Sequence, residues 1–246
     1  MYILIYRVDI KYIAASYDGL GNGDLMTDIQ CFKNIFKDKT AIVMGSGCSL
    51  KNVDIKLLHK AKDRGMPIIA VNAAIGYYHD SQFFVTDDKN VKYWSYYDDM
   101  LDRNNKTKMV IARRFATDFE LNDDRFVIVD TVVSNRIEEN RFITSKTSVS
   151  LAISFAHYIG CNTICLLGCD VSNDCGKKYF WEYDGFKKYT NSKDRDINSV
   201  NQDNVYESML SWWSKFAYAN QTLNIINCNT RSLITDFPKI ELEKFI

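Results

Sequence analysis

The chain alternates between short apolar runs and longer segments in which apolar residues recur every three or four positions. Predicted strands, each built around a short apolar run, occur at residues 41–44, 66–72, 81–88, 108–114, 125–132, 163–168 and 223–229. Helical spacing occurs at residues 53–65, 149–159 and 205–219. Strands that are apolar along their whole length are typical of a parallel sheet with both faces covered. The pattern therefore predicts an α/β, Rossmann-like, doubly wound fold with a mainly parallel sheet.

Start and stop residues delimit the predicted helices. The first helix ends at Gly65, and the second begins after Thr147 and Ser148 and ends at Gly160. The second is apolar nearly all round, so we expect it to be buried against the sheet. The third is expected to turn a row of large residues toward the core: Val205, Met209, Trp212, Trp213 and Phe216.

The chain contains only two prolines and no repeat or low-complexity tract, so residues 39–246 are expected to form one Rossmann-like domain. Residues 1–38 precede it as an N-terminal extension, predicted to hold a strand or hairpin. A polar stretch rich in aromatic residues, at about 174–201, interrupts the alternation and predicts a lid.

Composition narrows the class of protein. With 31 basic and 31 acidic residues the formal charge is zero, which argues against nucleic acid as a partner. No apolar run approaches the ~20 residues that span a bilayer, which leaves only peripheral membrane contact open. Charged residues near the start argue against a secretory signal, and seven cysteines in mostly apolar contexts indicate reduced thiols. We therefore expect a cytoplasmic protein.

The tryptophans and cysteines add two expectations. Trp181, Trp212 and Trp213 leave room for a homo-oligomer interface. The cysteines include no CxxC pair, so we expect no zinc site among them.

Polar residues directly follow the predicted strands. In a doubly wound sheet the carboxyl ends of the strands share one edge, and ligands bind there, where the strand order reverses. Each position alone has an ordinary explanation as a turn former or a helix cap. Their shared placement predicts one binding rim, made of residues 45–49, Asn72, Asp87, Asp88, Asp170, Asn227 and Asn229.

The turn Gly45-Ser46-Gly47-Cys48-Ser49 has the composition of a phosphate-binding loop. It lacks the third glycine of a dinucleotide fingerprint, because Leu50 stands there, and it lacks the Lys-Ser/Thr of a P-loop. Helix N-termini after Gly47 and after Thr147 are expected to converge on an anion. Asp170 is placed to accept hydrogen bonds from a ribose diol.

Four stretches, "IVMGSGCSL", "IIAVN", "TSVSLAISFAHYIGCNTICLLGCD" and "INCNTRSLI", together resemble the bacterial sialyltransferases of glycosyltransferase family 42. They are similar also to the wider DUF115 group, which includes motility-associated flagellin glycosyltransferases and archaeal (MptE-like) hydroxymethylpterin pyrophosphokinases. The resemblance covers residues 39 to 240 and implies a nucleotide-binding transferase domain.

The resemblance also implies site residues. The turn made by Gly45, Ser46, Gly47, Cys48 and Ser49 would lie against a nucleotide phosphate. A second set would contact the nucleotide or the donor sugar: Asn72, Thr147, Ser148, Gly168, Asp170, Asn227, Asn229 and Ser232. Tyr179 and Tyr183 would act from the lid, with Trp181 and Tyr189 beside them. The alternative is that these rings only pack on the domain or form an interface.

The chain departs from the sialyltransferases at the catalytic base, because the span that should hold a histidine, "YTNSKDRDINSVNQDNV", has none. His59 is expected on the solvent side of a helix and His157 in packing, which leaves His79 as the histidine that could approach the rim. Otherwise a carboxylate must serve as base, from Asp87, Asp88, Asp194 or Asp196.

Three functions remain open. The first is a metal-independent glycosyltransferase that needs no cofactor, transferring from a nucleotide-activated sugar to a glycan or other hydroxyl acceptor, with a CMP-linked nonulosonic acid as one candidate donor. The second is a pyrophosphokinase-like phosphotransferase, with Mg²⁺ on Asp87, Asp88 and Asp170. The third is a non-catalytic nucleotide-binding module, which the missing histidine favours.

Overall fold

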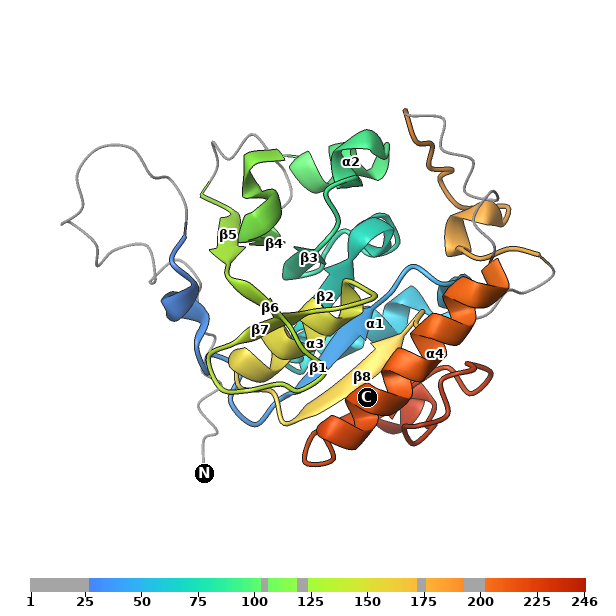
Figure 1. Ribbon diagram of the computed structural model, residues 1–246. Helices are drawn as coiled ribbons and strands as arrows, with labels where there is room; N and C mark the ends of the chain where they lie inside the picture. The colour runs from blue at the N-terminus through green and yellow to red at the C-terminus, as the bar shows by residue number, and fades with distance from the viewer. Residues whose placement is uncertain (1–26, 103–105, 119–123, 172–175, 193–201) are drawn as a thin grey trace, which may run out of the picture.

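A computed structural model describes residues 27–102, 106–118, 124–171, 176–192 and 202–246 (Figure 1). Its centre is a seven-stranded sheet in which every neighbouring pair is parallel. The strands are β1 (Thr40–Met44), β2 (Ile68–Val71), β3 (Phe83–Thr86), β4 (Lys108–Ala112), β5 (Phe126–Val129), β8 (Thr163–Leu167) and β9 (Asn224–Asn227). Their order, β5-β4-β3-β2-β1-β8-β9, reverses between β1 and β8. The predicted doubly wound α/β fold is confirmed.

Helices cover both faces of this sheet: α1 (Ile55–Asp63), α2 (Tyr96–Leu101), α3 (Val149–Tyr158) and α4 (Gln202–Ala219) (Figure 1). Successive strand residues point to opposite faces, so each strand contributes to two separate hydrophobic clusters. Val43 of β1 packs in the cluster that includes α3 and α4. Its neighbour Ile42 packs in the cluster that includes α1 and α2.

The helix ends follow the predicted signals, with one correction in α4. Gly65 and Gly160 adopt positive φ angles of 75° and 96° after α1 and α3. All of α3 except His157 is buried, as expected for a helix that is apolar nearly all round. In α4, however, Val205 is 38% exposed and belongs to neither hydrophobic cluster. The inner face of α4 therefore begins at Tyr206, which packs against the core together with Met209.

Two local predictions were wrong. No α-helix begins directly after Gly47, because residues 48–52 form a short 3₁₀ helix, η3 (Cys48–Asn52). The α-helix α1 starts after Asp54, whose side chain accepts the N–H of Lys56 at 2.9 Å. The predicted strand 125–132 is also divided, since β5 ends at Val129. The chain then enters β6 (Thr131–Val133), which pairs with β7 (Phe142–Thr144) in a separate two-stranded parallel sheet.

Most of the predicted N-terminal extension, residues 1–26, lies outside the described residues. Residues 27–38 hold the 3₁₀ turn η2 (Ile29–Phe32) and no strand. Phe32 is buried and meets Phe83 edge-on with ring centroids 5.7 Å apart. Across the described chain, no helix combines the length and apolar character needed to cross a membrane.

Candidate functional site at the carboxyl edge of the sheet

The turn after β1 packs directly against the end of β8, where the strand order reverses. Gly45 donates its N–H to Leu167 O at 2.7 Å, and Gly47 donates to Gly168 O at 2.8 Å. A Cβ atom on Gly47 would lie 2.5 Å from Asp170 Oδ2 and 2.7 Å from Gly168 O. Gly47 has an ordinary φ of −65°, so the glycine is needed for the close approach and not for its conformation.

Asp170 holds this turn in place. Its side chain is buried, and Oδ2 accepts the N–H of Ser49 at 2.7 Å and the thiol of Cys48 at 3.5 Å. Its Oδ1 accepts the Ser49 hydroxyl and the side-chain amide of Asn229 at 2.6 Å. The ribose contact predicted for Asp170 would have to displace one of these four donors.

The loop after β9 completes this side of the edge. Asn227 is fully buried, and its Oδ1 accepts the N–H of Asn229 at 3.0 Å, which directs Asn229 toward Asp170. Ser232 donates its hydroxyl to Cys169 O at 3.0 Å. Asn227 and Ser232 therefore shape the loop, while Asn229 reaches the turn.

The edge continues through β2 and β3. Ser46 donates its hydroxyl to Val71 O at 3.0 Å, and Asn72 accepts the Thr86 hydroxyl at 2.8 Å. Asn72 has a φ of 52°, a left-handed conformation that asparagine tolerates better than most residues. Val171, directly after Asp170, has a φ of 49°, which is strained for a β-branched side chain.

Asp87 joins β3 to the start of α3 and to β4. Its backbone N–H donates to Ser148 Oγ at 3.1 Å, and its carboxylate accepts from Arg114 Nη2 at 2.7 Å and from the Thr144 hydroxyl. Burial raises the pKa of the Asp87 carboxyl, and the neighbouring Arg114 opposes this rise. Thr147 caps the same helix start by accepting the N–H of Val149 at 3.3 Å.

The charge of Asp88 acts on two tyrosines, Tyr96 and Tyr179. Its Oδ1 accepts the backbone and side-chain amides of Asn90 at 2.8 and 2.9 Å. Burial raises the pKa of Tyr96, with the Asp88 charge as the next contribution. Burial, then Glu182, then Asp88 raise the pKa of Tyr179. Both phenols are therefore held in the protonated form, which can donate a hydrogen bond.

The described part of the predicted lid, residues 176–192, lies on the turn. Tyr179 pairs with Gly47 in an antiparallel bridge, and the Phe180 N–H donates to Ser46 O at 3.3 Å. Trp181 and Tyr189 are buried, which agrees with the alternative that such rings pack on the domain.

The hydroxyls of the lid tyrosines have different surroundings. Tyr189 donates its hydroxyl to Asp99 at 2.7 Å, and the ring of Tyr183 lies 3.4 Å from Lys51 Nζ. The charge of Asp88 contributes to the raised pKa of Tyr179.

Some predicted residues are not brought to the rim. His79 is exposed in the turn before β3, close to Gln82, whose side chain accepts the N–H of Ile68 at the start of β2. It therefore lies at the opposite edge of the sheet. His59 lies on exposed α1 surface, 3.1 Å from the Tyr78 hydroxyl. Asp194 and Asp196 lie outside the described residues.

The carboxylates of the predicted Mg²⁺ set, Asp87, Asp88 and Asp170, do not form a cluster of three ligands in the described part of the chain. Within the described ranges, no three acidic, histidine or cysteine side chains gather closely enough to hold a metal ion. Asp170 faces the turn after β1, whereas Asp87 faces Arg114, so the carboxylates point to different partners.

Arg114 is the main residue that the sequence reasoning missed. It comes two residues after the end of β4, so the same rule that located Asp87 after β3 would have located it. Thr144 had no such signal, because β7 was not predicted.

Comparisons with known proteins agree with this architecture. A solved structure described as MAf glycosyltransferase from Magnetospirillum magneticum AMB-1 superposes with a TM-score of 0.52 at 13% sequence identity. The match covers 86% of this chain and 35% of that one, so this chain spans about a third of the other protein, and the likeness shows the fold. A search of curated proteins finds no match.

A protein family described as 6-hydroxymethylpterin diphosphokinase MptE-like matches residues 20–175, which include β1 to β8 and the turn at Gly45. This match covers more than half of the chain. The chain therefore belongs to the MptE-like family.

Proposed function

We propose that the protein is a transferase that binds a nucleotide-activated donor where β1 and β8 part, and that it transfers a sugar from this donor to a hydroxyl acceptor. The observation that carries the proposal is the turn of residues 45–49, which Asp170 fixes at the topological switch point. Ligands of doubly wound sheets bind at this point, and a glycine turn there lets backbone amides approach a phosphate.

The proposed chemistry uses groups on both sides of the turn. The start of α3, at Ser148, offers the positive end of a helix dipole to the departing phosphate. The protonated phenol of Tyr179 is a candidate donor to the same phosphate. Asp88 is our candidate base for the acceptor hydroxyl, because it lies on the rim and its charge contributes to the raised pKa of Tyr179.

Glycosyl transfer is favoured over other transfers by the similar fold of a protein that is described as a glycosyltransferase. Within the class of nucleotide-activated sugars, our specific candidate for the donor is a CMP-linked nonulosonic acid. The identity of the donor is the first part of the proposal to test.

Diphosphate transfer is the second candidate, because the family description names a diphosphokinase. Such a reaction commonly needs Mg²⁺ held by carboxylates and phosphate oxygens. The described carboxylates do not form such a set, so we derive no step through a metal.

Thermal shift with CMP, CDP, UDP, GDP and ATP, each with EDTA or with Mg²⁺, separates the candidates. Stabilisation by a pyrimidine nucleotide that is unaffected by EDTA supports glycosyl transfer. Stabilisation confined to ATP with Mg²⁺ supports diphosphate transfer and overturns the first proposal. Stabilisation without donor hydrolysis or transfer in any acceptor mixture supports a binding module.

A matched pair of variants ties the result to this site. Ser46→Ala removes a hydroxyl at the turn, and Ser214→Ala removes an exposed hydroxyl on α4. We expect only Ser46→Ala to weaken the nucleotide shift. Equal shifts in both variants and in the unmodified protein would place the nucleotide elsewhere.

A further inference from the structure

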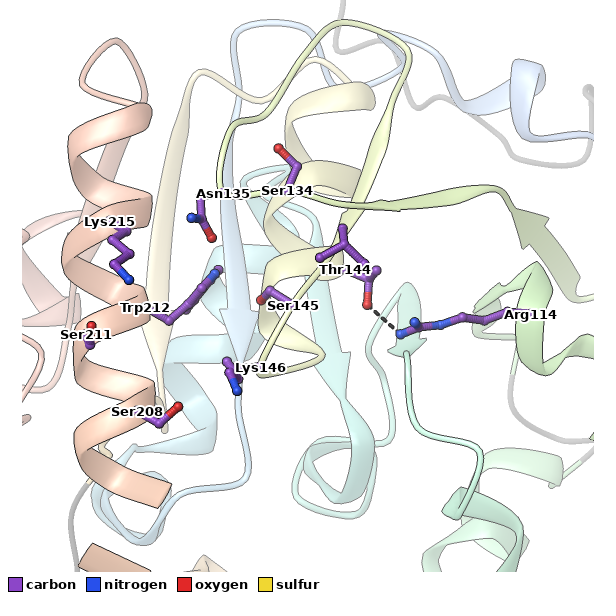
Figure 2. A pocket seen from close by; sticks show the side chains of 11 residues that line it. Arg114, Ser134, Asn135, Thr144, Ser145, Lys146, Ser208, Ser211, Trp212 and Lys215 are labelled. Atoms are coloured by element: carbon purple, nitrogen blue, oxygen red, sulfur yellow. Dashed lines mark hydrogen bonds between the residues drawn. The ribbon is translucent and has the colours of Figure 1, made fainter. Parts of the chain in front are cut away.

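A cavity of about 520 Å³ lies between α4, the start of α3 and the small β6–β7 sheet (Figure 2). Its volume is in the range of small-molecule sites. Four residues of α4 line it with spacings of three and four, Ser208, Ser211, Trp212 and Lys215, which places them on one helix face. Figure 2 shows them opposite Ser145 and Lys146, which precede α3.

Two buried hydrogen-bonding groups of this cavity have no partner among the described residues. Trp212 is 6% exposed, and its indole Nε1 has no acceptor among the described residues. Ser145 Oγ is also buried and unpartnered there. A buried N–H or hydroxyl that lacks a partner costs about 1–3 kcal/mol, so its retention needs an explanation. Trp213 Nε1 is likewise unpartnered but does not line the cavity, and we use only the pair that converges on it.

The charge of the cavity is positive. Arg114, Lys146 and Lys215 line it, and no acidic side chain is among its described lining residues. Arg114 is paired with Asp87, whereas Lys146 and Lys215 have no carboxylate partner in the described part of the chain. Hydroxyls, an indole N–H and two ammonium groups form a set that consists mainly of donors, and such a set is complementary to an anion.

We propose that this cavity is a second binding site, separate from the rim, for a phosphate monoester of about monosaccharide size. The phosphate would accept hydrogen bonds from Lys146, Lys215 and the indole of Trp212. The serines on α4 and before α3 would bind the hydroxyls of the ligand. The volume is larger than a bare phosphate needs, which is why we assign a ligand that carries a sugar-sized body.

The cavity is connected to the rim through Arg114. Its Nη2 donates to Thr144 Oγ1 at 2.6 Å and to Asp87 Oδ2 at 2.7 Å, and Thr144 and Arg114 both line the cavity. An anion in the cavity would therefore compete with Asp87 for the guanidinium. The inference itself does not depend on the proposed function, because it needs no nucleotide.

Isothermal titration with glucose 6-phosphate, inorganic phosphate and glucose, in the absence of nucleotide, tests the proposal. We expect glucose 6-phosphate to bind most tightly, phosphate to bind more weakly and glucose to bind least, with affinity falling as salt is raised. Lys146→Met with Lys215→Met should reduce the affinity for glucose 6-phosphate at least about tenfold, because charge-assisted hydrogen bonds are lost.

The matched control is Lys56→Met with Lys244→Met, which makes the same charge change at two exposed lysines outside the cavity. This variant should retain the unmodified affinity. Trp212→Phe, which keeps most of the ring but removes the N–H, should weaken phosphate binding while circular dichroism verifies the fold. Absence of binding by both phosphate compounds, equal binding of glucose and its phosphate, or equal losses in the two double variants would each overturn the proposal.

Discussion

The carboxylate of Asp170, at the end of β8, accepts the backbone N–H of Ser49 at 2.7 Å and so fixes the turn that follows β1. An aspartate at the end of such a strand is often assigned to ligand binding, but the carboxylate of Asp170 is hydrogen-bonded within the protein. The turn is therefore formed before any ligand arrives, which reduces the conformational entropy that binding must offset.

Asp170→Asn tests this role. An amide offers one acceptor oxygen where the carboxylate offers two, and its NH₂ group would face the donors of Ser49 or Asn229. We expect the free energy of unfolding to fall by about 1.5–3 kcal/mol, measured by urea denaturation. The exposed Asp236→Asn should change it by less than about 0.5 kcal/mol, and equal effects would contradict the assignment.

Gly47 and Gly65 need glycine for different physical reasons. Gly47→Ala should lose about 1–3 kcal/mol of stability, because the new Cβ would overlap Asp170 and Gly168. Gly65→Ala should lose about 1–2 kcal/mol, because Gly65 has a φ of 75° with open space around it. Thermal shifts on adding nucleotide distinguish the two variants, because Gly47→Ala should abolish the nucleotide-induced stabilisation and Gly65→Ala should retain it. A shift that survives in Gly47→Ala would remove the turn from the site.

Asn72 combines a left-handed backbone with a side-chain contact to Thr86, and two substitutions separate these properties. Asn72→Gly keeps the conformation accessible and removes the hydrogen bond, whereas Asn72→Ala also adds strain. We expect Asn72→Ala to be less stable than Asn72→Gly by about 1–2 kcal/mol in chemical denaturation. Equal stabilities would mean that the φ of 52° carries no cost.

Arg114→Gln should produce a stability loss that depends on pH. Burial already raises the folded-state pKa of Asp87, and Arg114 opposes this rise. Removing Arg114 raises the folded-state pKa of Asp87 further. Because this pKa is raised, the protonated carboxyl stabilises the fold below the ordinary aspartate pKa, and this stabilisation is lost as the pH rises through the folded-state pKa.

Urea denaturation of both proteins at about pH 4.5 and about pH 7 gives the measurement. The deficit of Arg114→Gln relative to the unmodified protein should be larger at the higher pH. Arg113→Gln, at an exposed pair with Asp130, is the control and should show little change. A deficit that is the same at both pH values would show that the Asp87 charge does not respond to Arg114.

Local patterns in the sequence determined the sheet, three of its helices and which residues lie at the carboxyl ends of the strands. Continuous apolar runs become buried parallel strands, and the carboxyl ends of such strands share an edge wherever the chain places them. Gly65, Gly160 and Asp170 could therefore be positioned from the sequence. The turn after Gly47 was misjudged, because a helix-compatible segment does not reveal that Ser49 bonds to a residue 121 positions away.

Only the tertiary structure decided which groups at that edge are engaged within the protein and which are left to bind. At that edge Asp170 is satisfied by the turn and Asp87 by Arg114. In the separate cavity between α3 and α4, Trp212 Nε1 and Ser145 Oγ have no partner among the described residues. The physical reason is that a hydrogen bond depends on distances of a few tenths of an ångström between segments far apart in the chain. Sequence periodicity fixes the face of an element, but packing of the whole chain fixes those distances.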